Sequence, residues 1–265
     1  MPHPLNRRQL WRPALALLPL LCGLGLPAGP ARAQALPDLV ERAKPAILVV
    51  GSYGELDSPR FGFRGTGFVV GDGRLALTAA HVLPAVQEEG RRLVVQVWQG
   101  EGRWSQRHAE VLDKDVAHDV ALLRFEGPAA PALPLAQGPA LREGSDVALI
   151  GFPLAGQLGF SPVTHRGILA ARTAISQPAA SAQQLQARAV AQLRRGAFEV
   201  LQLDITAYPG NSGGPVFDLA RGEVVGIMSM VLVKGTKEAA LSAPSGISYA
   251  VPIDQGLALL RALKP

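Results

Sequence analysis

The feature that most limits the fold of this chain is its succession of short apolar runs separated by turn residues. The sequence contains 29 glycines and 22 prolines, while only 5% of its residues are aromatic. Because Gly and Pro interrupt helices and mark turns, we expect many short strands and few long helices. Regularly spaced short strands of this kind are typical of antiparallel barrels and sandwiches.

Twelve segments have the β-branched or apolar character of strands. They span residues 47–50, 65–70, the first part of 75–83, 93–98, 109–112, 120–125, 146–150, 163–171, 199–203, 215–218, 223–231 and 247–251. Residues 52–64 are predicted to be a turn-rich loop, and residues 127–139 are the best candidate for an interdomain linker. Helices are expected at 36–44 and 254–263, and an inserted helix at 181–195.

The first 33 residues have the pattern of an export signal. Arg7, Arg8 and Arg12 precede an apolar run, and Ala31-Arg32-Ala33 offers a small-x-small cleavage site. The apolar run, 13–26, is too short to span about 30 Å of hydrocarbon, so we expect no stable membrane insertion after signal removal. An uncleaved anchor and a twin-arginine export route remain alternatives. The prediction is an exported protein, periplasmic or secreted.

The net charge of +5 comes mostly from that leader, whose four arginines are its only charged side chains. Without them 22 basic residues face 21 acidic residues, and no basic stripe remains. Nucleic-acid binding is therefore not expected. The only cysteine, Cys22, also lies in the leader, so the mature chain would contain no disulfide.

A serine surrounded by small residues is the strongest chemical signal. Ser212 lies in Gly210-Asn211-Ser212-Gly213-Gly214, ahead of an apolar run. Glycines allow a tight turn that brings backbone N–H groups close to a substrate. A serine hydroxyl becomes a good nucleophile only when a base accepts its proton and donors stabilise the oxyanion. The sequence should therefore also supply a histidine and a carboxylate.

His81 and Asp119 are the best candidates for these partners. His81 follows a strand and two alanines, which leave room around its imidazole. Asp119 immediately precedes a buried strand, where a carboxylate is costly unless a group such as an imidazole N–H pairs with it. Asp113 and Asp115 lie in a polar loop and need no such partner. His118 is the alternative histidine, but it adjoins Asp119 and is poorly placed to face the serine.

Together these residues form three motifs in the chain order His, Asp, Ser. The motifs are Thr78-Ala79-Ala80-His81, Asp119-Val120-Ala121-Leu122-Leu123 and Gly210-Asn211-Ser212-Gly213-Gly214-Pro215. The chain thereby resembles the trypsin-like serine proteases of the chymotrypsin fold. Three further motifs make it most similar to the HtrA/Deg branch over residues 36–262. These are Gly65-Thr66-Gly67-Phe68, Gly151-Phe152-Pro153 and Gly246-Ile247-Ser248-Tyr249-Ala250-Val251-Pro252.

The resemblance implies an all-β fold of two antiparallel six-stranded Greek-key barrels, with short N- and C-terminal helices and one inserted helix. Residues 34–130 would form the barrel carrying His81 and Asp119, and residues 131–265 the barrel carrying Ser212. It also implies that Ser212 is the nucleophile, His81 the general base and then acid, and Asp119 its orienting partner. The N–H groups of Gly210 and Ser212 would form the oxyanion hole, and neither metal nor cofactor is required.

The chain departs from the family pattern in several places. We expect it to lack the PDZ domain common in the HtrA/Deg branch, and Phe152 and Tyr208 replace residues that are usually asparagines. The insertion around 181–195 is also unusual. It would be either an inert surface insertion or a lid or partner-docking element. Asn211 stands where digestive members have an aspartate that pairs with a new N-terminal ammonium. Signal removal is therefore not expected to act as zymogen activation.

By the same resemblance, Thr206 would form the floor of the primary specificity pocket. Its walls would come from Met228, Ser229, Met230 and Tyr249. A basic substrate side chain would need a carboxylate at that depth, so cleavage is predicted after small or medium aliphatic residues.

These observations predict an exported serine endopeptidase that acts on proteins or peptides, in protein quality control or processing. An oligomer is compatible with the sequence. The alternative is a catalytically weak binding or chaperone-like module on the same fold. An esterase is a further alternative, although its expected chain order is Ser, Asp, His.

Overall fold

The structure is a computed structural model that describes residues 36–84, 90–155, 159–175, 198–229 and 246–263. The leader, the predicted helix at 181–195 and Met230 lie outside these residues. In the described part of the chain, no helix is both long and apolar enough to cross a membrane.

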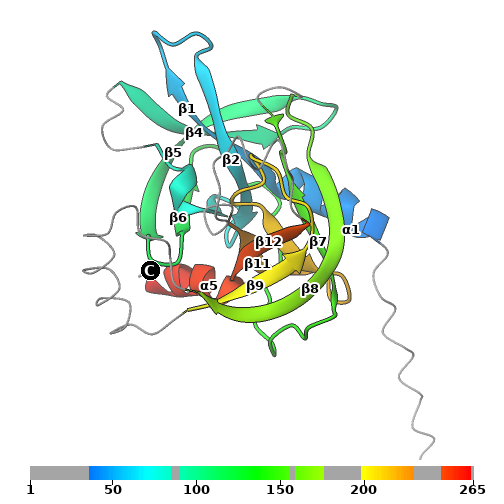
Figure 1. The fold of residues 1–265 in the computed structure, drawn as a ribbon. Coiled ribbons are helices and arrows are strands. Elements are labelled where there is room, and N and C mark those ends of the chain that lie inside the picture. The colour runs from blue at the N-terminus through cyan, green and yellow to red at the C-terminus, as the bar shows by residue number, and fades with distance from the viewer. Residues whose placement is uncertain (1–35, 85–89, 156–158, 176–197, 230–245, 264–265) are drawn as a thin grey trace, which may run out of the picture. The chain divides into compact units, whose positions relative to one another are not determined.

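The first barrel is a closed six-stranded antiparallel sheet. Its strands follow the order β1-β2-β3-β6-β5-β4 around the barrel (Figure 1). Every pairing between neighbours is antiparallel, and the jump from β3 to β6 gives the Greek-key connection. The strands are β1 (Ile47–Gly54), β2 (Phe61–Val70), β3 (Leu75–Thr78), β4 (Arg91–Trp98), β5 (Trp104–Asp115) and β6 (Val120–Phe125).

The second barrel repeats this arrangement with the order β10-β11-β12-β9-β8-β7. Its pairings are also antiparallel throughout. Its strands are β7 (Asp146–Gly151), β8 (Val163–Ile175), β9 (Phe198–Asp204), β10 (Pro215–Asp218), β11 (Glu223–Met228) and β12 (Ile247–Pro252). The predicted class, two six-stranded antiparallel barrels, is confirmed.

Among the described residues, two α-helices flank the barrels. In α1 (Leu36–Ala43) the buried residues are Leu39 and Ala43, which are four positions apart and therefore share one helix face. The C-terminal helix α5 (Ile253–Ala262) packs closely enough that a Cβ on Gly256 would lie 2.7 Å from the Leu77 side chain and 3.5 Å from that of Ile227. Since Leu77 lies in β3 and Ile227 in β11, α5 contacts strands of both barrels.

The segment that joins the barrels is also held by both of them. Leu133 N–H donates to the carbonyl of Val69 in β2, and Ala136 N–H donates to the carbonyl of Val224 in β11. Leu133 and Ala136 are both buried. The Pro- and Ala-rich stretch predicted as a linker is therefore hydrogen-bonded and packed along these residues.

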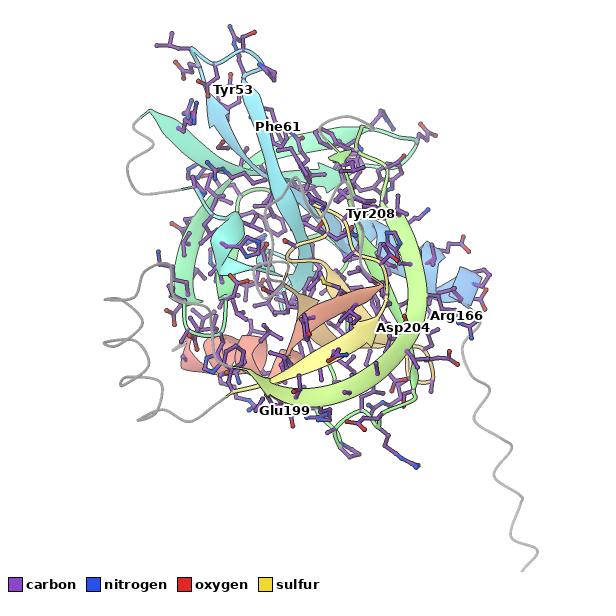
Figure 2. All side chains as sticks on the ribbon, viewed as in Figure 1. Tyr53, Phe61, Arg166, Glu199, Asp204 and Tyr208 are labelled. Atoms are coloured by element: carbon purple, nitrogen blue, oxygen red, sulfur yellow. The ribbon has the colours of Figure 1, made fainter. Side chains whose placement is uncertain are left out.

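One predicted loop is largely strand. Residues 52–64 were expected to be turn-rich, but β1 continues to Gly54 and β2 begins at Phe61. Tyr53 and Phe61 pair across the hairpin, near the end that projects from the barrel (Figure 2). Pairing of β1 with β4 supports these residues, because Ser52, Tyr53 and Gly54 all have partners in that strand. Local composition missed this because the support comes from a strand distant in the sequence.

Candidate active site

Asp119 lies one residue before β6, in a backbone conformation that few side chains adopt. Its φ is +57°, in the left-handed region where Asn and Asp are enriched among non-glycine residues. Its carbonyl accepts the N–H of Ala80 at 3.1 Å. These features turn the carboxylate back toward the residues that follow β3.

Three donors meet at the Asp119 carboxylate, which is only 6% exposed. The backbone N–H of His81 donates to Oδ1 at 2.9 Å, and Nδ1 of the same residue lies 2.7 Å from Oδ2. The hydroxyl of Ser229 also donates to Oδ2, at 2.5 Å. These three hydrogen bonds fix the orientation of the buried carboxylate.

His81 is held by a short turn. The strand β3 ends at Thr78, and His81 is the middle residue of the 3-10 helix η2 (Ala80–Val82). Because Asp119 accepts at Nδ1, the neutral ring carries its proton there and leaves Nε2 as an acceptor. The His81 side chain is 29% exposed, so this nitrogen belongs to a ring that a substrate can approach.

The Ser212 loop is closed by its own backbone hydrogen bonds. Asn211 N–H donates to the Tyr208 carbonyl at 3.0 Å, and Gly214 N–H donates to the Asn211 carbonyl at 2.9 Å. Gly213 N–H donates to the carbonyl of Met228 in β11 at 2.8 Å.

The two N–H groups predicted for the oxyanion hole differ from their neighbours in their hydrogen bonding. Among the hydrogen bonds of the described residues, the backbone N–H groups of Gly210 and Ser212 donate in none. The Pro209 carbonyl, in the same peptide unit as the Gly210 N–H, accepts the N–H of Leu154 at 2.9 Å. In a trans peptide the N–H points away from the carbonyl, so this bond sets the direction of the Gly210 N–H.

Gly210 cannot be replaced without moving the backbone. Its φ is +104°, and a Cβ there would lie 2.2 Å from the carbonyl oxygen of Phe152. Phe152 itself is fully buried, with its ring edge-to-face against Trp104 at 5.5 Å between centroids. The residue that replaces a usual family asparagine is therefore a packing residue directly behind the loop.

Ser212 is only 5% exposed, and its loop abuts the turn that carries His81. A Cβ on Gly213 would lie 2.3 Å from Thr78 Oγ1 and 2.9 Å from the Ala79 nitrogen. The hydrogen bonds of the described residues do not include one between Ser212 and His81. The structure thus pairs His81 with Asp119 and brings the Ser212 loop against residues immediately before His81.

The predicted pocket residues occupy different environments. Thr206 and Tyr249 are half-buried, whereas Met228 and Ser229 are fully buried. The strand β9 ends at Asp204, two residues before Thr206, so strand alternation by itself does not determine whether these two side chains share a face. Asp204, labelled in Figure 2, is the last residue of β9 and is exposed. Ser229, predicted as a pocket wall, uses its hydroxyl to bind Asp119.

The alternative candidates for the catalytic carboxylate and imidazole, Asp113, Asp115 and His118, have other hydrogen-bond partners. Asp115 Oδ1 accepts the backbone N–H of His118, and its Oδ2 lies 2.5 Å from Nδ1 of the same residue. Burial acts to raise the pKa of Asp115, but the hydrogen bonds from His118 and Ala117, together with attraction to the His118 ring, hold this pKa below its ordinary value. The His118 ring also packs edge-to-face on Phe198. The Asp113 carboxylate accepts the backbone N–H of its neighbour Lys114.

Two contacts escaped the sequence reasoning. One is the bond from Ser229 to Asp119, and the other is a set of bonds between Thr66 and the Ser212 loop. In the sequence, Gly65-Thr66-Gly67 stood out only as part of a family motif, and nothing local indicated the partners of Thr66. Within the described residues, no group of three or more His, Cys, Asp or Glu side chains is gathered that could hold a metal ion.

The fold and this arrangement of residues agree with a comparison against known families. A family model described as a trypsin-like peptidase domain matches residues 65–227. The chain therefore belongs to the trypsin-like peptidase family.

Among individual proteins, the chain is similar to bacterial proteins described as probable periplasmic serine endoproteases. It is 31% identical over 200 residues to a probable periplasmic serine endoprotease DegP-like of Pseudomonas fluorescens, which covers 76% of this chain and 35% of the relative. A protein of the same name from Halomonas elongata is 29% identical, over 91% of this chain and 52% of the relative. The chain thus spans about a third to a half of the length of these curated relatives.

Among solved structures, an HtrA-type protease AlgW variant with a tripeptide has the same fold. Its TM-score is 0.61 at 22% identity, covering 86% of this chain and 62% of that chain.

Proposed function

We propose that this protein is an exported serine endopeptidase that hydrolyses peptide bonds with Ser212, His81 and Asp119. The observation that carries the proposal is the buried Asp119 carboxylate, bound to Nδ1 of His81 at 2.7 Å, next to a glycine-rich loop whose Gly210 and Ser212 N–H groups donate to no described residue. Membership of the trypsin-like peptidase family supports the same reading.

In the first half of the reaction, Nε2 of His81 accepts the proton of the Ser212 hydroxyl as Oγ attacks the substrate carbonyl carbon. The N–H groups of Gly210 and Ser212 donate to the carbonyl oxygen as it becomes negative. Asp119 stabilises the imidazolium and keeps its Nδ1 proton in place. His81 then returns a proton to the leaving amine, the C–N bond breaks, and an acyl-enzyme remains.

In the second half a water molecule attacks the ester bond of the acyl-enzyme. His81 accepts one proton of that water and then delivers it to the Ser212 oxygen as the second tetrahedral intermediate collapses. The products are a carboxylic acid and the original serine hydroxyl. No redox or metal chemistry enters these steps, which consume one water for each peptide bond.

We further propose cleavage after small or medium aliphatic residues. Thr206, assigned to the pocket floor, carries no charge, and its neighbours Ile205 and Ala207 carry none either. A graded preference follows, because each matched methylene contributes about 1 kcal/mol or somewhat more. The names of the relatives support a periplasmic location and a substrate class of proteins or peptides.

The test uses chain lacking residues 1–33 and a fluorophosphonate probe, together with casein and a peptide library. The wild type should be labelled and should hydrolyse casein, and Ser212→Ala should lose both while keeping its thermal unfolding midpoint. Ser161→Ala, which changes an exposed serine elsewhere, serves as the matched control and should behave as the wild type.

Absence of labelling and hydrolysis in the folded wild type would instead favour a binding or chaperone-like module. Dominant cleavage after Arg or Lys in the library would show that the pocket assignment is wrong.

A further inference from the structure

Thr66 is a fully buried polar residue in β2 that contacts the Ser212 loop through both its backbone and its side chain. Its N–H donates to the Ser212 carbonyl at 2.8 Å. Its hydroxyl lies 2.6 Å from the Gly210 carbonyl oxygen, and its own carbonyl accepts the hydroxyl of Thr78 at 2.7 Å. A residue from the first barrel thus binds both residues whose N–H groups are assigned to the oxyanion hole.

The direction of these bonds is determined by the groups involved. The N–H of Phe152 can only donate, and it lies 3.1 Å from Thr66 Oγ1. The carbonyl of Gly210 can only accept. The single proton of the Thr66 hydroxyl must therefore point to Gly210, and the oxygen accepts from Phe152. The hydroxyl thereby connects the segment after β7 to the loop that carries Ser212.

Gly210 is the residue that most needs such a contact. It has no side chain to restrict its rotation, and its φ of +104° lies in a region that glycine alone readily adopts. The peptide before it is fixed by the bond from Leu154 to the Pro209 carbonyl, and the peptide after it is fixed by Thr66. With both neighbouring carbonyls held, the direction of the Gly210 N–H is fixed.

We infer that Thr66 is a positioning residue, which holds the Gly210 and Ser212 N–H groups in the geometry that stabilises the oxyanion. This inference rests on the proposed function, since it assigns a role within the same reaction. The hydroxyl does not contact the substrate, so its contribution is indirect. Loss of a whole oxyanion donor lowers kcat by about 10²- to 10³-fold. Loosening one donor should have a smaller effect, about 10- to 100-fold.

The experiment compares Thr66→Val, Thr66→Ser and Thr66→Ala in chain lacking residues 1–33. Valine has nearly the same shape as threonine and suits a strand, but it leaves the Phe152 N–H and Gly210 carbonyl without their partner. Serine keeps the hydroxyl, and alanine removes it together with the methyl group. The matched control is Thr164→Val, because Thr164 Oγ1 is buried without a hydrogen-bond partner among the described residues.

Three measurements separate positioning from a general loss of stability. They are kcat and KM on succinyl-Ala-Ala-Val p-nitroanilide, inhibition by the matching peptide aldehyde, and the thermal unfolding midpoint. The aldehyde forms a tetrahedral adduct with Ser212 whose oxygen occupies the oxyanion hole, whereas the corresponding peptide alcohol cannot.

In Thr66→Val we expect kcat to fall about 10- to 100-fold with KM changed less than threefold. Affinity for the aldehyde should fall in the same proportion, because it resembles the transition state. Affinity for the alcohol should not change, and Thr66→Ser should restore kcat to within about threefold. Thr164→Val should match the wild type in all of these measurements.

A Thr66→Val protein that is folded and retains wild-type kcat would overturn the role of Thr66 while leaving the proposed function intact. The role would also be wrong if affinities for aldehyde and alcohol fell equally, or if Thr66→Ser failed to recover. If Thr66→Val does not fold, Thr66→Ala is read by the same criteria. Absence of Ser212-dependent hydrolysis in the wild type would instead overturn the proposed function, and the role of Thr66 with it.

Discussion

Replacing Asp119 by Asn is the most informative single test of the proposed mechanism. The side chains have the same shape, and Asn also tolerates the φ of +57° found at this position. Alanine would add backbone strain to the loss of charge. The Asn variant therefore changes the chemistry of the carboxylate and leaves the fold as it is.

The three donors determine which way the new amide points. The backbone N–H of His81 cannot rotate, so the amide oxygen must take the position of Oδ1. The NH₂ group then takes the position of Oδ2, which now faces His81 Nδ1 at 2.7 Å and the Ser229 hydroxyl at 2.5 Å. The hydroxyl can rotate and accept, but the imidazole can accept at Nδ1 only if its proton moves to Nε2. In that tautomer Nε2 cannot accept the proton of Ser212.

We therefore expect Asp119→Asn to lower kcat by about 10⁴-fold, as the wrong tautomer does in another Ser-His-Asp enzyme. At 1.36 kcal/mol for each factor of ten, this is about 5.4 kcal/mol of transition-state stabilisation. Ser229→Ala is the comparison variant. It removes one charge-assisted hydrogen bond of about 1.5–3 kcal/mol but keeps the tautomer, so a loss of about tenfold, and no more than about 100-fold, is expected.

The assay measures the second-order rate of fluorophosphonate labelling and the hydrolysis of a peptide substrate at pH 8, with thermal unfolding as a check of the fold. A folded Asp119→Asn protein within tenfold of the wild type would refute the argument from hydrogen-bond directions. A Ser229→Ala effect as large as that of Asp119→Asn would refute the tautomer explanation, since Ser229 does not control the tautomer.

Two further predictions concern stability. The Asn211 side chain is fully buried and neither of its polar atoms has a hydrogen-bond partner among the described residues, so Asn211→Asp would bury an unpaired carboxylate. We expect denaturant unfolding at pH 8 to show a loss of about 3 kcal/mol or more, shrinking as acid protonates the carboxyl group, and an unchanged stability would contradict this. Burial lowers the pKa of His165 in the folded chain. As the pH falls below the unfolded value of about 6.5, the unfolded chain therefore binds a proton that the folded chain does not. The free energy of unfolding should decrease as the pH is lowered through this range. His165→Leu should therefore reduce the drop in unfolding midpoint between pH 8 and pH 5.5, and His108→Gln, at an exposed site, should not; equal drops in all three proteins would contradict the assignment.

The local sequence was sufficient to predict the strands and the general fold. Short apolar runs between Gly- and Pro-rich turns predicted antiparallel barrels, because alternation and turn chemistry act over a few residues. The motif resemblance then narrowed this prediction to two six-stranded barrels. The same local signals indicated Ser212, His81 and Asp119 as candidates, since each lies near the end of a strand. Ser212 is surrounded by glycines, His81 follows two alanines, and Asp119 is a carboxylate directly before a buried strand.

Contacts between distant segments depended on the tertiary structure alone. Asp119 lies 38 positions from His81 and 110 from Ser229, and Thr66 lies 144 positions from Gly210. Sequence patterns show which face a residue takes within its own strand, but they do not show which strand of the other barrel will face it. For that reason Ser229 could be predicted only as a pocket wall, and its bond to Asp119 became visible only when the barrels were closed and packed together. Thr66 shows the same limit, because one buried hydroxyl acquires its role only when two loops from the second barrel reach it.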